Sequence, residues 1–397
     1  VYRDNLGDTS TNNGIGLSLL RTRIAPGGTT VANTIMKMAQ ARGAKVWSTP
    51  WSPAAQFKSN TNVNGGSFVA TTDNYQAYAD QLAGYVAKMK NQYGVNLYAV
   101  SVQNEPDANV NTYESCNWSA QEIHDFIPYL YGALTASNVA STKIMLPESQ
   151  NWQDYSNLAT TAMNDSGVAA DVGIIGDHNY DGMNGPASLA KNSYGKPLWE
   201  TEVALLNGSD SSITNGVYYA QRIYLFMTNN VNAFHYWWLI SGDSTGNEGL
   251  MDENASPTKR LFAFGQYSRF VRPGYYRIGA DNETAALISA YKDSTSSNFA
   301  VVAVNDNAVA INQTFTLTNF TAISVTPWIT SSNFSLANQP AVSVVNSTFN
   351  YTLPPMSIVT FVGQAATPNT PPVLASVPNQ IINAGVTLVI TNVATDA

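Results

Sequence analysis

The feature that most constrains this chain is an alternation, over residues 16–271, of short apolar runs with longer amphipathic stretches. A short apolar run bounded by turn residues is typical of a buried strand. A stretch with apolar residues three and four positions apart is typical of a helix that covers a core. Their repeated alternation predicts βα units arranged around a parallel sheet.

Seven segments of this region are predicted as strands. They are residues 16–24, 45–50, 97–103, 143–146, 172–178, 197–202 and 233–240. The predicted helices cover residues 31–42, 73–93, about 119–134, 218–227 and 260–271. Since seven strands are one short of eight, we expect an α/β fold of the (β/α)₈ TIM-barrel type whose first strand is missing.

The pattern changes at about Arg272, where short alternating strands replace the helical stretches. A series of short alternating strands without helices predicts a β-sandwich. We therefore expect three parts: a catalytic barrel over residues 1–271, a side β-sandwich over 272–364, and a tail over 365–397. The tail would comprise a Pro- and Thr-rich linker and the start of an immunoglobulin-like segment.

Composition excludes several classes of partner. The net charge is −8, with 19 Lys and Arg against 27 Asp and Glu, and no basic run suits a nucleic acid. No apolar run approaches the ~20 residues that span a bilayer. The single cysteine, Cys116, cannot form an intramolecular disulfide. A surface rich in Asn, Ser, Thr and Tyr instead predicts a secreted, extracellular bacterial protein that handles neutral polar ligands.

Candidate catalytic groups lie where barrel strands end, because a TIM barrel places its chemistry at the carboxyl ends of its strands. Glu105 and Glu202 both follow or end apolar runs. Taken singly, such an acid is more often a loop salt bridge or a helix cap. Taken together, they would lie on strands that face each other across the barrel mouth. Retaining glycoside hydrolysis needs two carboxylates about 5–5.5 Å apart, so the pair points to a glycosidase.

Four strings carry a resemblance to a known family. They are SVQNEP at 101–106, WETEV at 199–203, HYWW at 235–238 and RFVRPGYY at 269–276. In combination they closely resemble glycoside hydrolase family 30, in particular its bacterial xylanase and glucuronoxylanase subfamily, subfamily 8. The similarity covers nearly all of residues 1–364. It implies a retaining endo-β-1,4-xylanase that acts on xylan or xylo-oligosaccharides and needs no cofactor.

The resemblance also implies roles for individual residues. The general acid/base of the family falls on Glu105 and its nucleophile on Glu202. Asn104 matches the residue that hydrogen-bonds the sugar 2-hydroxyl in this clan, and Arg21 matches the barrel arginine that orients the catalytic carboxylate. An ordinary loop asparagine and an ordinary buried ion pair are the alternatives for these two.

His178 and Tyr180 resemble the family's pair at the end of strand six, where the tyrosine hydroxyl donates to the nucleophile. Aromatic side chains would line the cleft and stack on sugar rings. These are Trp51, Tyr236, Trp237 and Trp238. Because alternate residues of a strand face opposite sides, burial in the core is the alternative for Tyr236 and Trp238.

Glu200 stands where the family usually has an apolar residue. Positions two apart share a face of a strand, so we expect Glu200 to point the same way as Glu202, one layer deeper. A carboxylate there needs a partner, for which Arg21 and Arg23 are the candidates. It would then tune the pKa of the nucleophile.

A loop after the last strand departs from the family pattern. Glucuronate-dependent members carry an arginine there, whereas residues 237–244 read WWLISGDS and Asp243 would repel a carboxylate. Our hypothesis is therefore a xylanase that does not depend on the glucuronic acid branch. A glucuronate-dependent glucuronoxylanase and a xylobiose-releasing xylanase remain alternatives.

The absent first strand is the second departure. Either the sequence is trimmed ahead of that strand, or residues 373–397 or a neighbouring chain occupies the gap. A monomer and a dimer formed through the open barrel edge are therefore both expected alternatives.

Other classes fit less well. The three histidines are scattered singly, without the spacing of metal ligands, and no G-X-S-X-G motif is present. The family that the chain resembles also includes glucosylceramidases and β-1,6-glucanases, and the xylanase-like strings argue against these activities. An inactive carbohydrate-binding protein is the rival from a different class, and the presence of both carboxylates argues against it.

Overall fold

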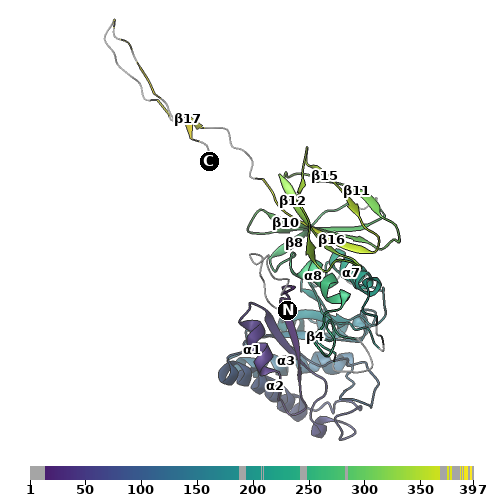
Figure 1. Ribbon diagram of the computed structural model, residues 1–397. Helices are drawn as coiled ribbons and strands as arrows, with labels where there is room; N and C mark the ends of the chain where they lie inside the picture. Colours follow the sequence, from purple (N-terminus) through teal and green to yellow (C-terminus); the bar gives the residue numbers. More distant parts are fainter. Residues whose placement is uncertain are drawn as a thin grey trace.

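A computed structural model describes residues 14–186, 194–206, 208, 210–241, 248–281 and 285–366. Beyond these, it describes residues 373–374, 376–377, 385, 387, 389–391 and 394–395. Within these residues a curled parallel sheet of seven strands lies beneath an antiparallel β-sandwich (Figure 1). This confirms the expected TIM-type barrel with a side sandwich.

The seven parallel strands follow one another in sequence order across the sheet. They are β1 (Leu19–Ile24), β2 (Lys45–Pro50), β3 (Leu97–Ser101), β4 (Lys143–Pro147), β5 (Val172–His178), β6 (Leu198–Glu202) and β7 (Ala233–Phe234). Within the described part of the chain, β1 and β7 are the two edges of this sheet. The expected strand at 233–240 is wrong in length, because the chain leaves the sheet at His235 and the Trp237 amide donates to the Val203 carbonyl instead.

Helices connect the strands on the outside of the sheet. They are α1 (Asn33–Gln40), α2 (Thr72–Tyr93), α3 (Ala120–Ala136), α4 (Tyr155–Leu158), α5 (Thr160–Asn164), α6 (Ser166–Asp171), α7 (Ile213–Thr228) and α8 (Lys259–Ser268), with a 3₁₀ turn at Ala55–Phe57. The expected capping box opens α3, since Ser119 and Glu122 bond each other's backbone amides. The three short helices between β4 and β5 have no clear periodic pattern and were not expected.

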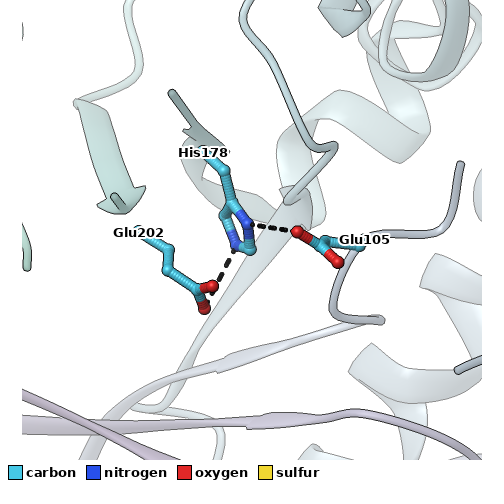
Figure 2. A group of neighbouring side chains, drawn as sticks. All are labelled: Glu105, His178 and Glu202. Atoms are coloured by element: carbon cyan, nitrogen blue, oxygen red, sulfur yellow. Dashed lines mark hydrogen bonds and ion pairs between the residues drawn. The ribbon is translucent and has the colours of Figure 1, made fainter. Parts of the chain in front are cut away.

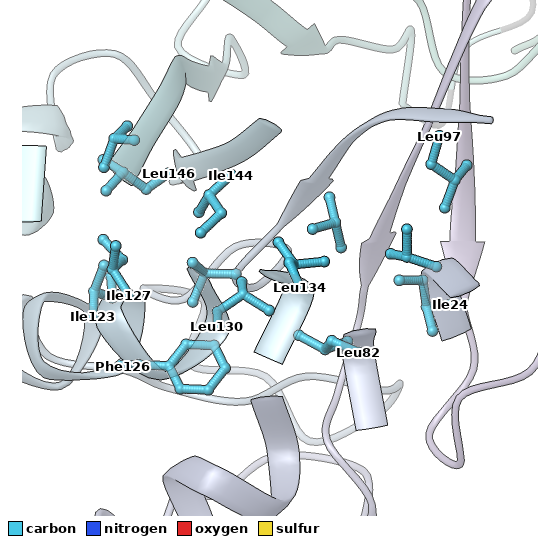
Figure 3. Close-up of a cluster of buried hydrophobic side chains, with 14 of the residues drawn as sticks. Ile24, Leu82, Leu97, Ile123, Phe126, Ile127, Leu130, Leu134, Ile144 and Leu146 are labelled. Carbon is cyan, nitrogen blue, oxygen red and sulfur yellow. The ribbon is translucent and has the colours of Figure 1, made fainter. Parts of the chain in front are cut away.

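The outer core lies between these helices and the sheet. Phe126, Ile127 and Leu130 of α3 face Ile144 and Leu146 of β4 across an apolar layer (Figure 3). Leu82 of α2 packs into the same layer. This is the apolar stripe that the helical periodicity predicted, and burying it fixes the helices on the sheet.

The barrel interior is a separate, smaller core with one residue from each of six strands. Its members are Trp47, Ala99, Met145, Ile174, Trp199 and Ala233. The Trp47 and Trp199 rings meet edge to face with centroids 6.2 Å apart. These large rings fill the lower barrel, so the floor of the barrel mouth is packed.

The sandwich consists of antiparallel strands that follow α8. They are β8 (Tyr275–Ile278), β9 (Leu287–Asp293), β10 (Asn298–Asn305), β11 (Ile311–Thr316), β12 (Ser324–Thr330), β13 (Ala337–Asn338), β14 (Val342–Ser343), β15 (Thr348–Leu353) and β16 (Ser357–Gln364). β11 and β15 pair with each other and face the larger sheet across buried Phe315, Phe349 and Phe361.

Helix α8 joins the two parts. Gln266 donates to Thr330 of β12 and its carbonyl accepts from Thr360 of β16, while the Arg269 guanidinium lies 4.6 Å from the Trp328 ring centroid. These buried polar contacts fix the sandwich against the barrel, and Figure 1 shows α8 between the two parts.

Most of residues 365–397, including the predicted linker, lies outside the described residues. The part that is described contains two short paired strands, β17 (Val373–Leu374) and β18 (Ala394–Thr395). Among the described helices, none has the length and apolar character needed to cross a membrane.

Candidate active site at the mouth of the barrel

Two buried glutamates converge at the carboxyl end of the sheet. Glu105 follows β3 and has a φ of +46°, and its amide donates to the Glu148 carbonyl at 2.9 Å. Glu202 is the last residue of β6. One oxygen of Glu105, one ring nitrogen of His178 and one oxygen of Glu202 all lie within 4.8 Å of one another. The convergence that the sequence predicted is therefore present.

Arg21 of β1 hydrogen-bonds three side chains of the site. Its Nη1 donates to Glu202 Oε2, its Nη2 donates to Asn104 Oδ1, and its Nε donates to Glu148 Oε1 at 3.1 Å. The side chain is 5% exposed. A planar guanidinium with several donors can orient three acceptors at once, so this one cation fixes both the nucleophile candidate and its neighbours.

His178, at the end of β5, lies between the two carboxylates (Figure 2). Its Nδ1 lies 3.1 Å from Glu105 Oε1, and its Nε2 lies 3.8 Å from Glu202 Oε2. Burial by itself lowers the pKa of His178. The charge of Glu202 and the hydrogen bonds to Glu105 and Glu148 outweigh burial and raise that pKa to about 10. The surrounding carboxylates thus favour the charged form of the ring, whose Nδ1 faces Glu105 Oε1 while its Nε2 lies 3.4 Å from Arg21 Nη2.

Glu148 is a third carboxylate that the sequence interpretation missed. It directly follows β4, is fully buried, and accepts from Thr49 Oγ1 as well as from Arg21. Burial raises the pKa of its carboxyl, but the charge of Arg21 and the bond to His178 outweigh this and lower it to about 2. The rule that singled out Glu105, an acid at the end of an apolar run, could have found it.

Tyr113 was also missed. It lies in the loop between β3 and α3, and its hydroxyl is 3.3 Å from Glu105 Oε2. Burial raises the pKa of Glu105, whereas the bond and charge of His178, the charge of Arg21 and the bond to Tyr113 lower it, and the net shift is downward. No periodic pattern marks this residue, since it lies in an irregular loop.

Tyr180 and Asn104 contact the site as the resemblance implied. The Tyr180 hydroxyl donates to Glu202 Oε1 at 2.7 Å, and burial and the Glu202 charge keep its pKa well above the usual value, so it stays a donor. Asn104 Oδ1 accepts from Arg21. This contact orients the amide so that its N–H groups can donate to a substrate hydroxyl.

Aromatic rings form one wall of the site. The Trp51 and Trp237 ring centroids are 5.4 Å apart, and the Arg21 guanidinium lies 4.7 Å from the Trp51 centroid. Trp238 stacks on Trp237 at 4.4 Å and is 40% exposed. Flat, partly exposed rings beside the carboxylates suit the faces of sugar rings.

The structure does not bring Tyr236 to the two carboxylates. Its ring packs against Tyr219 and Phe264, and its hydroxyl donates to the Glu248 carbonyl at 2.6 Å. It belongs to the core beneath α7 and α8, which is the alternative that strand alternation left open.

Glu200 is buried as expected, but neither arginine is its hydrogen-bond partner. Its Oε2 accepts the His235 amide at 2.9 Å, whereas Arg21 bonds Glu202 and Glu148 and Arg23 bonds the half-buried Glu114. The effect of burial on the carboxyl therefore outweighs the hydrogen bond from the His235 amide, and it raises the pKa of Glu200 to about 8. The expectation of an arginine pair was wrong because both guanidiniums find carboxylates nearer the barrel mouth.

The cluster of Glu105, His178 and Glu202 is the group of described residues whose donor atoms could surround a metal ion. A metal would need a free lone pair on the imidazole. The Arg21 guanidinium donates to Glu202 Oε2 and lies 3.4 Å from His178 Nε2, so a cation already stands beside these atoms and disfavours a metal ion there. Asp243, on which the branch hypothesis rests, lies outside the described residues.

Known proteins share this architecture. Residues 28–279 match the glycosyl hydrolase family 30 TIM-barrel domain. The chain is 34% identical over 336 residues to "Glucuronoxylanase XynC" of Bacillus subtilis, covering 82% of this chain and 75% of that protein.

Two solved structures are similar over nearly the whole chain. A family 30 subfamily 8 xylanase from Clostridium acetobutylicum has a TM-score of 0.78 and 33% identity, covering 88% of this chain and 90% of that one. A family 30 endoxylanase from Clostridium papyrosolvens has a TM-score of 0.73 and 31% identity, with the same coverage of both chains.

Proposed function

The chain belongs to glycosyl hydrolase family 30, and we propose that it is a retaining endo-β-1,4-xylanase that hydrolyses the xylan backbone. The observation that carries this is the carboxylate pair, whose nearest oxygens lie within 4.8 Å. Such a separation suits direct attack on the sugar, since inverting enzymes need about 6.5–9.5 Å to admit a water. The named activities of the two Clostridium enzymes support xylan as the substrate.

In the first step, we assign Glu202 as the nucleophile. Its carboxylate attacks the anomeric carbon while the bond to the leaving oxygen breaks, and Glu105, after taking a proton from solvent, gives that proton to the leaving oxygen. Arg21 and Tyr180 each donate a hydrogen bond to Glu202, and these two bonds hold its carboxylate in place before the attack. Asn104, oriented by Arg21, would donate to the sugar 2-hydroxyl as positive charge develops on the ring.

In the second step, Glu105 acts as a base. It takes a proton from a water, the water oxygen attacks the anomeric carbon, and the bond to Glu202 breaks with net retention of configuration. His178 contacts Glu105 and lies near Glu202, so its positive charge stabilises whichever carboxylate is ionised in each step. Since xylan is an extracellular polymer, this function implies a secreted enzyme.

We further propose that the glucuronic acid branch is not required. The argument is the absence of an arginine from residues 237–244, where Asp243 stands instead. A cation would be needed to pair with the branch carboxylate, and an acidic residue would oppose it. The identity to a protein named glucuronoxylanase favours the alternative, a branch-dependent enzyme.

Product analysis on paired substrates separates these possibilities. The protein would be incubated with methylglucuronoxylan and with linear, unbranched xylo-oligosaccharides, and the products resolved by chromatography. Comparable cleavage of both substrates is expected. Cleavage of the branched polymer alone would favour the branch-dependent alternative. Xylobiose as the main early product would favour a xylobiose-releasing xylanase over an endo-acting one.

The same experiment tests the rival hypothesis that the chain is an inactive carbohydrate-binding protein. Such a protein would retain xylan on a gel without releasing reducing ends. Glu202→Gln is the matched control, because it should abolish hydrolysis while leaving retention on the gel intact.

A further inference from the structure

The two oxygens of Glu105 have different surroundings. Oε1 accepts from His178, which is fully buried, whereas Oε2 accepts from Tyr113, whose side chain is 43% exposed. An oxygen bound to a buried cation faces the protein interior. The proton that Glu105 gives to the leaving oxygen must therefore be carried on Oε2, the oxygen beside Tyr113.

The loop that carries Tyr113 is anchored next to it by two charged side chains. Arg23 of β1 donates to Glu114 through both Nε, at 2.7 Å, and Nη2. Lys58, which is buried, donates to the Ser115 carbonyl and to Ser52 Oγ at 3.0 Å. The residues directly after Tyr113 are thus fixed to the barrel, and the position of its ring follows from them.

We propose that Tyr113 is a positioning residue for the acid/base, holding Oε2 of Glu105 toward the leaving oxygen, and that it marks the leaving-group side of the cleft. The inference rests on the proposed role of Glu105. It follows from the placement of the tyrosine, because the atom protonated by Oε2 belongs to the leaving sugar. No covalent bond to Tyr113 forms or breaks.

The tyrosine remains a donor throughout. Burial and the negative charge of Glu105 raise the pKa of Tyr113 to about 12, so its hydroxyl keeps its proton at every pH at which the enzyme would work. Its hydrogen bond favours the ionised form of Glu105. Removing the hydroxyl should therefore raise the pKa of Glu105.

The other charged groups around Glu105 all remain in the variant. They are His178 from β5, Arg21 from β1, Glu202 from β6 and Asp107 from the same loop. A shift in the pH profile of a Tyr113 variant would consequently report the lost phenol.

The test compares Tyr113→Phe with the wild type on two substrates. The leaving group of a xylo-oligosaccharide is a sugar, which is a poor leaving group and must be protonated by the general acid. The leaving group of dinitrophenyl β-xylobioside is dinitrophenolate, which departs without being protonated. We expect kcat on xylo-oligosaccharides to fall about tenfold, the scale of one hydrogen bond to a charged group. The loss on the activated substrate should be much smaller.

The pH profile supplies a second readout that a structural role would not move. Because the acid/base must be protonated to act, the alkaline limb of kcat/KM on xylo-oligosaccharides should shift to higher pH in Tyr113→Phe. Tyr131→Phe, at an exposed tyrosine of α3, is the matched control and should match the wild type on both substrates.

The outcomes are distinguishable. A wild-type protein that cleaves neither substrate would refute the proposed function itself. An active wild type with an equally active Tyr113→Phe variant and an unmoved alkaline limb would overturn only the role of Tyr113. An equal loss on both substrates would also overturn it, since the residue would then act on folding or binding instead.

Discussion

The barrel contains two layers that use the same residue types, glutamate and histidine, in different electrostatic surroundings. In the upper layer, Glu202 and His178 belong to a network of ion pairs with Arg21. In the layer beneath, Glu200 bonds the His235 amide, and neither of these buried residues forms an ion pair with another described residue. The pKa of His178 is about 10, whereas that of His235 is about 4.

Burial does not explain this difference, since both imidazoles are buried. His235 donates from Nδ1 to the Glu200 carbonyl, at 2.7 Å, and accepts from the Trp47 indole at Nε2, at 3.1 Å, which suits a neutral ring. His178 instead faces Glu105, Glu148 and Glu202. Neighbouring charge therefore decides whether burial yields a charged or a neutral layer.

The largest expected difference is between the two histidines themselves. Nitrogen-15 NMR of the three histidines should show His178 protonated on both nitrogens up to about pH 10. It should show His235 neutral down to about pH 4, because burial disfavours its charged form. His124, on the surface of α3, provides an internal reference. Similar midpoints for His178 and His235 would remove the contrast between the layers.

The next largest effect separates the two glutamates of β6. Glu202→Gln should lower kcat on xylo-oligosaccharides by at least about 10⁴-fold, since the nucleophile is lost. Glu200→Gln, two positions earlier, should retain most of the activity. Equal losses in both variants would mean that the deeper carboxyl takes part in the chemistry.

Removing the central cation should destabilise the upper layer. Arg21→Met leaves Glu148 and Glu202 buried without their partner, and should lower the free energy of unfolding by about 3–5 kcal/mol in chemical denaturation. Arg23→Met is the control from the same strand. Its pair with Glu114 is 44% and 24% exposed, so its loss should cost about 1 kcal/mol or less.

The smallest effect concerns the lower layer and pH. Folded protein keeps a proton on Glu200 up to a pKa of about 8, whereas the unfolded chain releases it near its ordinary value of about 4.3. The unfolded state thus binds fewer protons, and stability falls as pH rises between these values. Glu200→Gln should remove this slope.

Chemical denaturation at pH 5 and pH 8 measures the slope. The stability of Glu200→Gln relative to the wild type should rise by about 3 kcal/mol between the two conditions. A relative stability that stays constant would indicate that Glu200 is ionised in the folded protein, contrary to the neutral lower layer.

Periodicity was sufficient to predict most of the barrel. Strands β2 and β5 have the bounds that their apolar runs indicated, because a strand buried on both faces is a continuous apolar run between turns. The strand at 233–240 was predicted too long, since an apolar run that leaves the sheet looks the same as one that stays in it.

The site was predicted less completely, and the gaps have physical reasons. Glu105 and Glu202 could be placed because strand ends and a family resemblance both marked them, whereas the resemblance alone marked Arg21. Tyr113 depends on the path of an irregular loop, which no local pattern encodes. The partners of Glu200 depend on which carboxylates lie within reach of Arg21, and that is a property of the assembled barrel.

The measurement that tests the central claim most directly is trapping of the covalent intermediate. The protein would be treated with an activated 2-fluoro-xylobioside, digested, and the labelled residue located by fragment-ion mass spectrometry. The account predicts a single label on Glu202, absent from Glu202→Gln and still present in Glu200→Gln. A label on Glu200, or on neither glutamate in a protein that cleaves xylan, would contradict it.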